Sequence, residues 1–137
     1  MLRYFRATCK ISLFAAALLC GGFTANAATY YVSQSTGDDS LDGLAAAKAG
    51  AKGPWKTLTK ASIQYKPGDS ILLKKGDTWN EELTPKGSGT PEKPILISSY
   101  GQGNKPLIDR EDFKQDRTGI RLDNQGGYKI VGIEFAR

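Results

Sequence analysis

The feature that most constrains the fold is a series of short apolar runs separated by turn residues. The first clear unit covers residues 66–84, where turn residues 67–69 and 76–77 each precede an apolar run. In the first run, Ile71 and Leu73 fall on one face of a strand with a period of two. Because strands this short are not stable alone, the chain has to bury several of them against one another.

Further runs of the same kind follow at close intervals, and every gap between them holds Gly, Pro, Asn or Asp. They cover residues 95–97, 107–108, 120–122, 128–130 and 133–135, and an earlier aromatic and β-branched run covers residues 28–33. One segment differs. Trp55, Leu58, Ser62 and Tyr65 recur at helical spacing, which predicts a short amphipathic helix over residues 54–65 that ends before Pro67.

Two all-β architectures accommodate many short strands: an antiparallel sandwich and a solenoid of stacked coils. Tight Asn-Gly or Asp-Gly hairpin dipeptides are absent between the runs except for Asp42-Gly43, which is far from any pair of runs, and this weakens the sandwich. Near the end, Tyr128 and Ile130 share one face, and residues 131–132 then shift the register so that Ile133 and Phe135 face the same core after a bend. A corner between two strands of one coil requires such a shift, so the pattern favours the solenoid.

The first residues predict a secretory signal peptide. Arg3, Arg6 and Lys10 form a basic head, residues 11–19 are mostly apolar, and residues 25–27 form a small-x-small cleavage site. The apolar run is too short for a membrane span, which needs about 20 such residues. We expect cleavage after Ala27, which divides the chain into a leader, 1–27, and an exported domain, 28–137, in the periplasm or outside the cell.

A lipoprotein leader is the alternative interpretation, because Cys20 follows a pair of leucines and precedes Gly21. Leu19, however, occupies the position where bacterial lipid attachment normally requires a small residue. Both cysteines, Cys9 and Cys20, lie in the leader, so the exported domain has no disulfide and depends on packing for its stability.

The charge of the chain gives little support to nucleic-acid binding. The complete sequence has a net charge of +5, and removal of the three leader cations leaves +2. No basic run is longer than Lys74-Lys75, and no helix has a one-sided basic face. The chain also has no His, and its only cysteines are in the leader, which excludes a Ser-His-Asp triad, a Cys nucleophile and the usual zinc sites within residues 28–137.

Taken together, several segments resemble the N-terminal portion of secreted right-handed parallel β-helix proteins of the pectate-lyase type. They are residues 30–33, 54–58, 66–74, 94–97, 100–101 and 129–135. The resemblance implies a right-handed parallel β-helix in which the helix from Trp55 to Tyr65 caps the N-terminal end of the stack. Its inward positions would be Ile71, Leu73, Ile95, Ile97, Ile108, Ile120, Leu122, Ile130, Ile133 and Phe135.

Members of that family continue for many further coils after a strand of the type found at residues 133–135. This chain stops at Arg137, so we expect a truncated product or a fragment holding only the cap and the first coils. An unpaired strand edge invites aggregation, which supports the fragment interpretation. The full-length protein is expected to be a monomer.

The resemblance implies a role on extracellular polysaccharide, with a lyase acting on an acidic, uronate-containing polymer as the first hypothesis. Such a reaction needs carboxylates for Ca²⁺ and a Lys or Arg as the base. Residues of the right type are present, although each also fits a solvated surface: Lys74, Lys75, Lys105, Lys129 and Arg121 as bases, and Asp109, Glu111, Asp112, Asp116 and Asp123 as oxygen donors.

The sharpest local pattern is Asp38, Ser40 and Asp42 followed by Gly43, which matches the opening of a calcium loop. The closing acid is missing, because Ala49 stands where an EF-hand places its bidentate Glu. A turn stabilised by Asp side chains is therefore the alternative interpretation. These three residues are the candidate Ca²⁺ ligands.

Four aromatic residues, Trp55, Tyr65, Trp79 and Tyr100, could stack on sugar rings, but the strand and helix patterns turn Trp55 and Trp79 toward the core. No catalytic residue can be assigned from the sequence, and the chain by itself is expected to be inactive, with the active groove in further coils. A non-catalytic carbohydrate-binding or surface solenoid and an inactive fragment are the two alternatives to the lyase.

Overall fold

A computed structural model of the protein describes residues 26–110 and 118–136. The described chain contains seven short strands and one helix of four residues, α1. Their bounds are β1 Thr29–Val32, α1 Leu58–Ala61, β2 Ser70–Lys74, β3 Thr78–Trp79, β4 Ile95–Tyr100, β5 Leu107–Ile108, β6 Tyr128–Ile130 and β7 Glu134–Phe135. The signal peptide predicted for residues 1–27 lies almost wholly outside the described residues.

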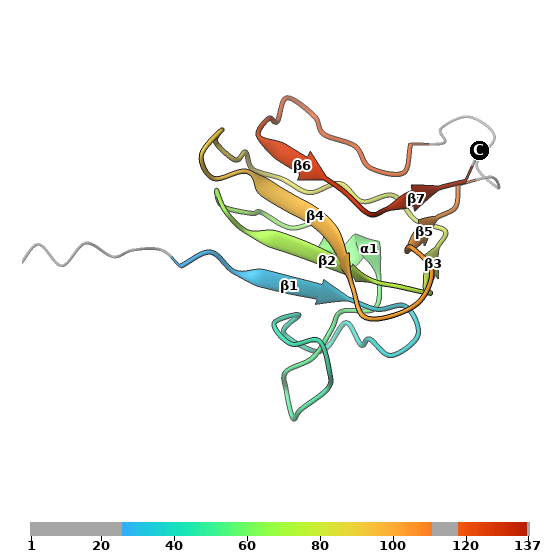
Figure 1. The fold of residues 1–137 in the computed structure, drawn as a ribbon. Coiled ribbons are helices and arrows are strands. Elements are labelled where there is room, and N and C mark those ends of the chain that lie inside the picture. The colour runs from blue at the N-terminus through green and yellow to red at the C-terminus, as the bar shows by residue number, and fades with distance from the viewer. Residues whose placement is uncertain (1–25, 111–117, 137) are drawn as a thin grey trace, which may run out of the picture.

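The strands form two sheets in which every strand pair is parallel (Figure 1). The larger sheet has the order β1-β2-β4-β6 and the smaller one β3-β5-β7, so from β2 onward the chain contributes to the two sheets in turn. The antiparallel sandwich, the alternative architecture, is therefore wrong for the described strands. Parallel strands cannot be joined by tight hairpins, which explains why Asn-Gly and Asp-Gly dipeptides do not separate consecutive strands from β2 onward.

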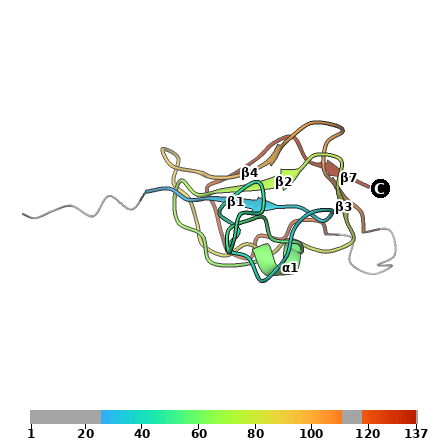
Figure 2. The ribbon, with the colours of Figure 1, turned by 90° about the horizontal axis from the view of Figure 1, so that it is seen from below.

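A third side of the molecule is formed by isolated parallel bridges rather than by a continuous sheet. Gln64 pairs with Lys86, and Leu83 pairs with Ile120. In Figure 2, β1, β2 and β4 overlap, β3 and β7 lie near one end of them, and α1 lies across from the larger sheet. The segments between α1 and β2, and between β3 and β4, meet on this third side.

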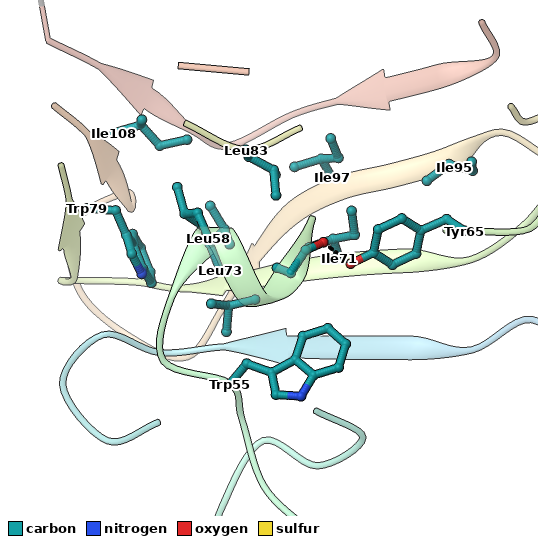
Figure 3. Close-up of a cluster of buried hydrophobic side chains, with 12 residues drawn as sticks. Trp55, Leu58, Tyr65, Ile71, Leu73, Trp79, Leu83, Ile95, Ile97 and Ile108 are labelled. Carbon is teal, nitrogen blue, oxygen red and sulfur yellow. Dashed lines mark hydrogen bonds between the residues drawn. The ribbon is translucent and has the colours of Figure 1, made fainter. Parts of the chain in front are cut away.

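The core lies between the two sheets and the third side (Figure 3). The period-two pattern is confirmed in β2 and β4, where Ile71, Leu73, Ile95 and Ile97 are fully buried. The register aligns Tyr30, Ile71, Ile97 and Ile130 in one column across the larger sheet. The other buried core residues are Val32, Trp55, Leu58, Ala61, Tyr65, Trp79, Leu83 and Ile108.

The turns predicted at residues 67–69 and 131–132 are present. Gly68 and Gly132 have φ angles of 90° and 72°, which favour glycine. Asp69 is buried, and its carboxylate accepts hydrogen bonds from the backbone N–H groups of Lys66 and Ala28, each at 2.8 Å. The first turn is thereby tied to the segment that enters β1.

The helix predicted from Trp55 to Tyr65 is much shorter in the structure, where α1 covers only Leu58–Ala61. Before it, Trp55 forms a parallel bridge with Val32, which requires extended backbone. After it, Tyr65 donates its backbone N–H to the Lys86 carbonyl at 2.8 Å. Pairing with neighbouring segments on both sides therefore competes successfully with helix formation.

The predicted core is also incomplete at one end of the stack. Ile130 and Phe135 share faces with the buried Ile97 and Ile108, yet 41% and 45% of their surface is exposed. Ile120, Leu122 and Ile133 are half-buried. Within the described residues no strand pairs with the outer edges of β6 and β7, so these side chains are covered from one direction only.

Among the described residues, no helix has the length and apolar character that crossing a membrane requires.

Candidate functional site

Two neighbouring depressions lie on the third side of the molecule, next to α1, and Thr84 lines both of them. We call them together the Thr84 groove. One, of about 330 Å³, is lined by Thr59, Ser62, Asn80, Glu81, Glu82, Thr84 and Arg110. The other, of about 280 Å³, is lined by Gln64, Thr84, Pro85, Lys86, Gly87, Arg121, Asp123 and Gln125. Most of the residues that line the groove have polar or charged side chains.

The position of Thr84 follows from its neighbour in the chain. Leu83 pairs with Ile120 and is fully buried, so alternation along the extended backbone turns Thr84 outward. The Thr84 backbone N–H donates to the Ser62 Oγ at 3.0 Å, and the Ser62 hydroxyl donates to the Leu58 carbonyl at 2.8 Å. These bonds fix the floor of the groove against α1.

Two adjacent carboxylates on the groove are held by donors from different segments. The Glu81 Oε2 accepts hydrogen bonds from the backbone N–H and the hydroxyl of Thr59, both at 3.0 Å. The Glu82 Oε1 accepts from the Arg121 Nε at 2.8 Å, in an ion pair with 20% of the Glu82 and 37% of the Arg121 side chain exposed. Both glutamates therefore act as hydrogen-bond acceptors in this structure.

A second polar cluster lies where β1 and β2 end. Asp77 is buried, and its Oδ2 accepts from the Ser33 hydroxyl at 2.9 Å and from the Ser35 backbone N–H at 3.2 Å. Burial alone would raise the pKa of Asp77, but the hydrogen bonds from Ser35 and Ser33 outweigh it and lower that pKa. The cluster thus favours the ionised carboxylate and closes the turns that follow the two strands.

Tyr100 extends from β4 beside this cluster. Its ring packs edge-on against Tyr31, with ring centroids 5.1 Å apart and planes at 84°. Burial, with a smaller effect of the Asp77 charge, raises the pKa of Tyr100 to about 12. The phenol is therefore neutral near pH 7, and the half-buried pair Tyr31–Tyr100 places aromatic surface on the larger sheet.

The candidate calcium ligands lie in the loop that follows β1. The Asp38 Oδ1 accepts from the backbone N–H and the hydroxyl of Ser40, at 2.9 and 2.7 Å. The Asp42 Oδ1 accepts from the N–H groups of Leu44 and Gly53, at 2.9 and 3.3 Å. These contacts describe Asp-stabilised turns, and residues 26–110 and 118–136 hold no group of three or more metal-ligating side chains. Calcium binding remains a prediction.

The candidate bases and oxygen donors are scattered rather than gathered. Arg121 and Asp123 both line the Thr84 groove. Lys74 lies elsewhere, at the C-terminal end of β2. Its amino group donates to the Ser35 hydroxyl at 2.9 Å. Lys105 and Lys129 are exposed on separate segments, Lys75 and Asp109 are half-buried, and Glu111, Asp112 and Asp116 lie outside the described residues.

The two tryptophans are core residues, as their patterns predicted. Their ring N–H groups donate to backbone carbonyls, Trp55 to Leu41 at 2.8 Å and Trp79 to Lys56 at 2.9 Å. The Tyr65 hydroxyl likewise donates to the Ala61 carbonyl at 2.6 Å. None of the three is a surface for a sugar ring.

Sequence reasoning did not find Thr84, Glu82 or Gln125. The Thr84 groove is assembled from residues 59–64, 80–87 and 121–125, with Arg110 at one end. No local motif marks these segments, because only the pairing of Gln64 with Lys86 and of Leu83 with Ile120 brings them together.

Comparison with known proteins gives two kinds of match, although no family model matches the chain. Over 92 residues the sequence is 38% identical to a lacto-N-biosidase of Bifidobacterium longum subsp. longum, a match that covers 62% of this chain and 5% of that protein. Two crystal structures of a GH136 lacto-N-biosidase from Eubacterium ramulus are also similar. The selenomethionine derivative gives a TM-score of 0.66 at 27% identity, and the native protein 0.63 at 28%.

Each structural match covers 80% of this chain and 20% of the solved one. The chain thus spans about a twentieth of the curated relative and a fifth of the solved structures. These matches overturn the resemblance to pectate lyases, since the similar proteins are glycoside hydrolases and not lyases. The physical reason for the error is that short parallel strands with Gly-rich turns specify a stacking geometry and not a reaction.

Proposed function

We propose that this chain forms the first coils of a right-handed parallel β-helix in an extracellular glycan-processing protein of the hydrolase type. The observation that carries the proposal is the parallel pairing of successive strands in two sheets together with the likeness to lacto-N-biosidase structures over 80% of the chain. The leader predicted for residues 1–27 supports the part of the proposal that concerns export, because an exported protein would meet extracellular glycans.

In this proposal α1 and the loop before it close one end of the stack. The side chains of Leu58 and Ala61 are fully buried and belong to the same core cluster as the inward residues of β2 and β4. Terminal caps of this kind protect the first coil of a repeat protein from solvent and from edge pairing. The described residues therefore have a structural role in the complete hydrolase.

Cleavage of a glycosidic bond generally uses two carboxyl groups, one of which must donate a proton to the leaving oxygen. Glu81 accepts two hydrogen bonds from Thr59, and Glu82 accepts one from Arg121. Since both carboxylates are engaged as acceptors, we assign them a positioning role and not the role of general acid. The proposal places hydrolysis in the whole protein and not in this chain alone.

The test is an assay of the protein purified from the culture medium of its native host. We expect it to release the disaccharide from a chromogenic lacto-N-bioside, as the names of its relatives suggest, and to leave polygalacturonate uncut. The 137-residue chain alone should show no turnover. An ultraviolet-absorbing unsaturated product from polygalacturonate, or release from no neutral glycan, would contradict the proposal.

The second candidate is a carbohydrate-binding protein without catalytic activity. The Thr84 groove offers polar contacts to a sugar, while its Glu81 and Glu82 carboxylates already accept hydrogen bonds from Thr59 and Arg121. Binding of the chromogenic glycan without release of the disaccharide would favour it.

Calcium binding by Asp38, Ser40 and Asp42 is a separate part of the proposal, supported by the oxygen-rich spacing alone. A rise in the melting temperature at millimolar calcium, lost in Asp38→Ala, would support it, whereas no shift would end it.

A further inference from the structure

The Thr84 groove has the chemistry of a binding site, and we infer that it binds a short stretch of a neutral oligosaccharide. The inference rests on the proposed function, which supplies the general class of ligand, a glycan. It assigns that glycan to the Thr84 groove and states that the glycan is uncharged and not acidic.

The charges on the groove are balanced. Three acidic and three basic side chains line the groove: Glu81, Glu82, Asp123, Lys86, Arg110 and Arg121. One acid and one base, Glu82 and Arg121, are bonded directly to each other at 2.8 Å. Selective binding of a uronate polymer would require an excess of positive charge, and a balanced groove does not provide it.

Several polar groups on the groove are held in place by hydrogen bonds within the protein. Sugars present hydroxyls that both donate and accept, so they are bound by amides, hydroxyls and carboxylates held in place. Ser62 and Glu81 are held by hydrogen bonds to α1, and the Thr84 backbone is bonded to Ser62. Because these groups are fixed before the ligand arrives, little conformational entropy is lost on binding.

The groove also holds a hydrogen-bond acceptor, on Gln125, that has no donor in the part of the chain that the structure describes. The Gln125 Oε1 is shielded from solvent, and within the described residues it has no hydrogen-bond partner. Gln125 also lines the smaller depression of the groove. Shielded polar atoms in native proteins normally have a partner, so a rotation of the half-buried Gln125 side chain toward the groove would let this oxygen accept from a ligand hydroxyl.

The experiment is a titration of the ¹⁵N-labelled chain, followed by NMR, with lacto-N-tetraose as the neutral probe and trigalacturonate as the acidic one. We expect the neutral tetrasaccharide to shift the backbone signals of residues 59–64, 80–87 and 121–125, and trigalacturonate to bind more weakly. Thr84→Val keeps the shape of the side chain and the backbone bond to Ser62, and removes the hydroxyl. It should weaken binding about tenfold, the effect of losing one hydrogen bond.

Gln125→Leu should weaken binding by a similar factor without lowering the melting temperature, because it removes an acceptor that has no donor. Thr78→Val is the matched control, since Thr78 is exposed on β3 and does not line the groove. It should bind like the unmodified chain.

Stronger binding of trigalacturonate, shifts outside the groove only, or unchanged affinity in both groove variants would overturn the inference. The titration does not depend on hydrolysis, so the two proposals fail separately. Loss of hydrolytic activity with binding retained contradicts only the proposed function, and hydrolysis without binding at the groove contradicts only this inference.

Discussion

Asp39 shows how much one side chain can decide about the local path of the chain. Its Oδ1 accepts from the backbone N–H groups of Lys56 and Thr57, at 2.8 and 3.0 Å, and its Oδ2 accepts from the Thr57 hydroxyl at 2.8 Å. Thr57 in turn caps α1 by accepting from the Lys60 N–H. Burial opposes ionisation of Asp39, but the hydrogen bonds from Thr57 and Lys56 outweigh it and lower the pKa of the carboxyl group.

Asp39→Ala should therefore destabilise the protein by about 1 to 3 kcal/mol, the cost of leaving donors near α1 without a partner. The neighbouring Asp38→Ala is the control, because the Asp38 side chain accepts from Ser40 within an exposed turn and pairs with the exposed Lys48. It should change the free energy of unfolding by no more than about 0.5 kcal/mol. Urea denaturation of both variants measures the difference, and equal stability of the two would contradict the role given to Asp39.

The loop between β1 and α1 is the element that the sequence pattern described least well. Its residues read as polar turns without periodicity, yet Leu41 is buried and Trp55 closes the loop by donating its ring N–H to the Leu41 carbonyl. The Trp55 ring also stacks on Tyr30, with centroids 5.2 Å apart. Gly43 passes directly beside this ring, and its carbonyl accepts from the Tyr31 N–H at 2.7 Å.

Gly43→Ala should be more destabilising than Gly50→Ala, although both glycines have left-handed φ angles, 75° and 63°. A Cβ at Gly43 would lie 2.4 Å from the Trp55 Cε2, whereas nothing lies within 4 Å of one at Gly50. The shared backbone strain is about 1 to 2 kcal/mol, and the clash should add about 1 to 3 kcal/mol at Gly43 alone. Thermal denaturation distinguishes the two, and equal melting temperatures would show that the loop moves away from Trp55 at no cost.

At the scale of the whole molecule, the two ends of the stack differ. The end beside β1 is covered by the loop between β1 and α1 (Figure 1). At the other end Ile130, Val131 and Phe135 are each more than 40% exposed, and β6 and β7 form the edges of their sheets. An exposed apolar layer with unpaired strand edges promotes association between chains.

The 137-residue chain in isolation should therefore self-associate, and Ile130→Lys should reduce this association, since charged residues on an edge strand oppose pairing. Leu44→Lys is the matched control, because Leu44 is 49% exposed in the loop at the opposite end. Sedimentation velocity over a range of concentrations measures the effect. A monomeric unmodified chain, or an equal effect of both lysines, would show that the β6 and β7 edges are not the contact.

The sequence by itself determined the local units of this protein. Period-two apolar positions at Ile71, Leu73, Ile95 and Ile97 identified strands and their buried faces, because alternation depends only on backbone geometry. The absence of hairpin dipeptides also pointed to parallel pairing, which the structure shows. The length of α1 was predicted incorrectly, since the competing partners of Trp55 and Tyr65 are distant in the chain. The predicted burial of Ile130 and Phe135 was also wrong for the described residues, because it depends on neighbours in space.

Only the tertiary structure decided where a ligand can bind. The Thr84 groove joins side chains from three segments that are up to about 60 residues apart, and it exists because Leu83 pairs with Ile120 and Gln64 with Lys86. The reaction class was likewise beyond the sequence pattern. A stack of short parallel strands is specified by backbone pairing and apolar burial, whereas a reaction is specified by a few side chains whose positions depend on the completed fold.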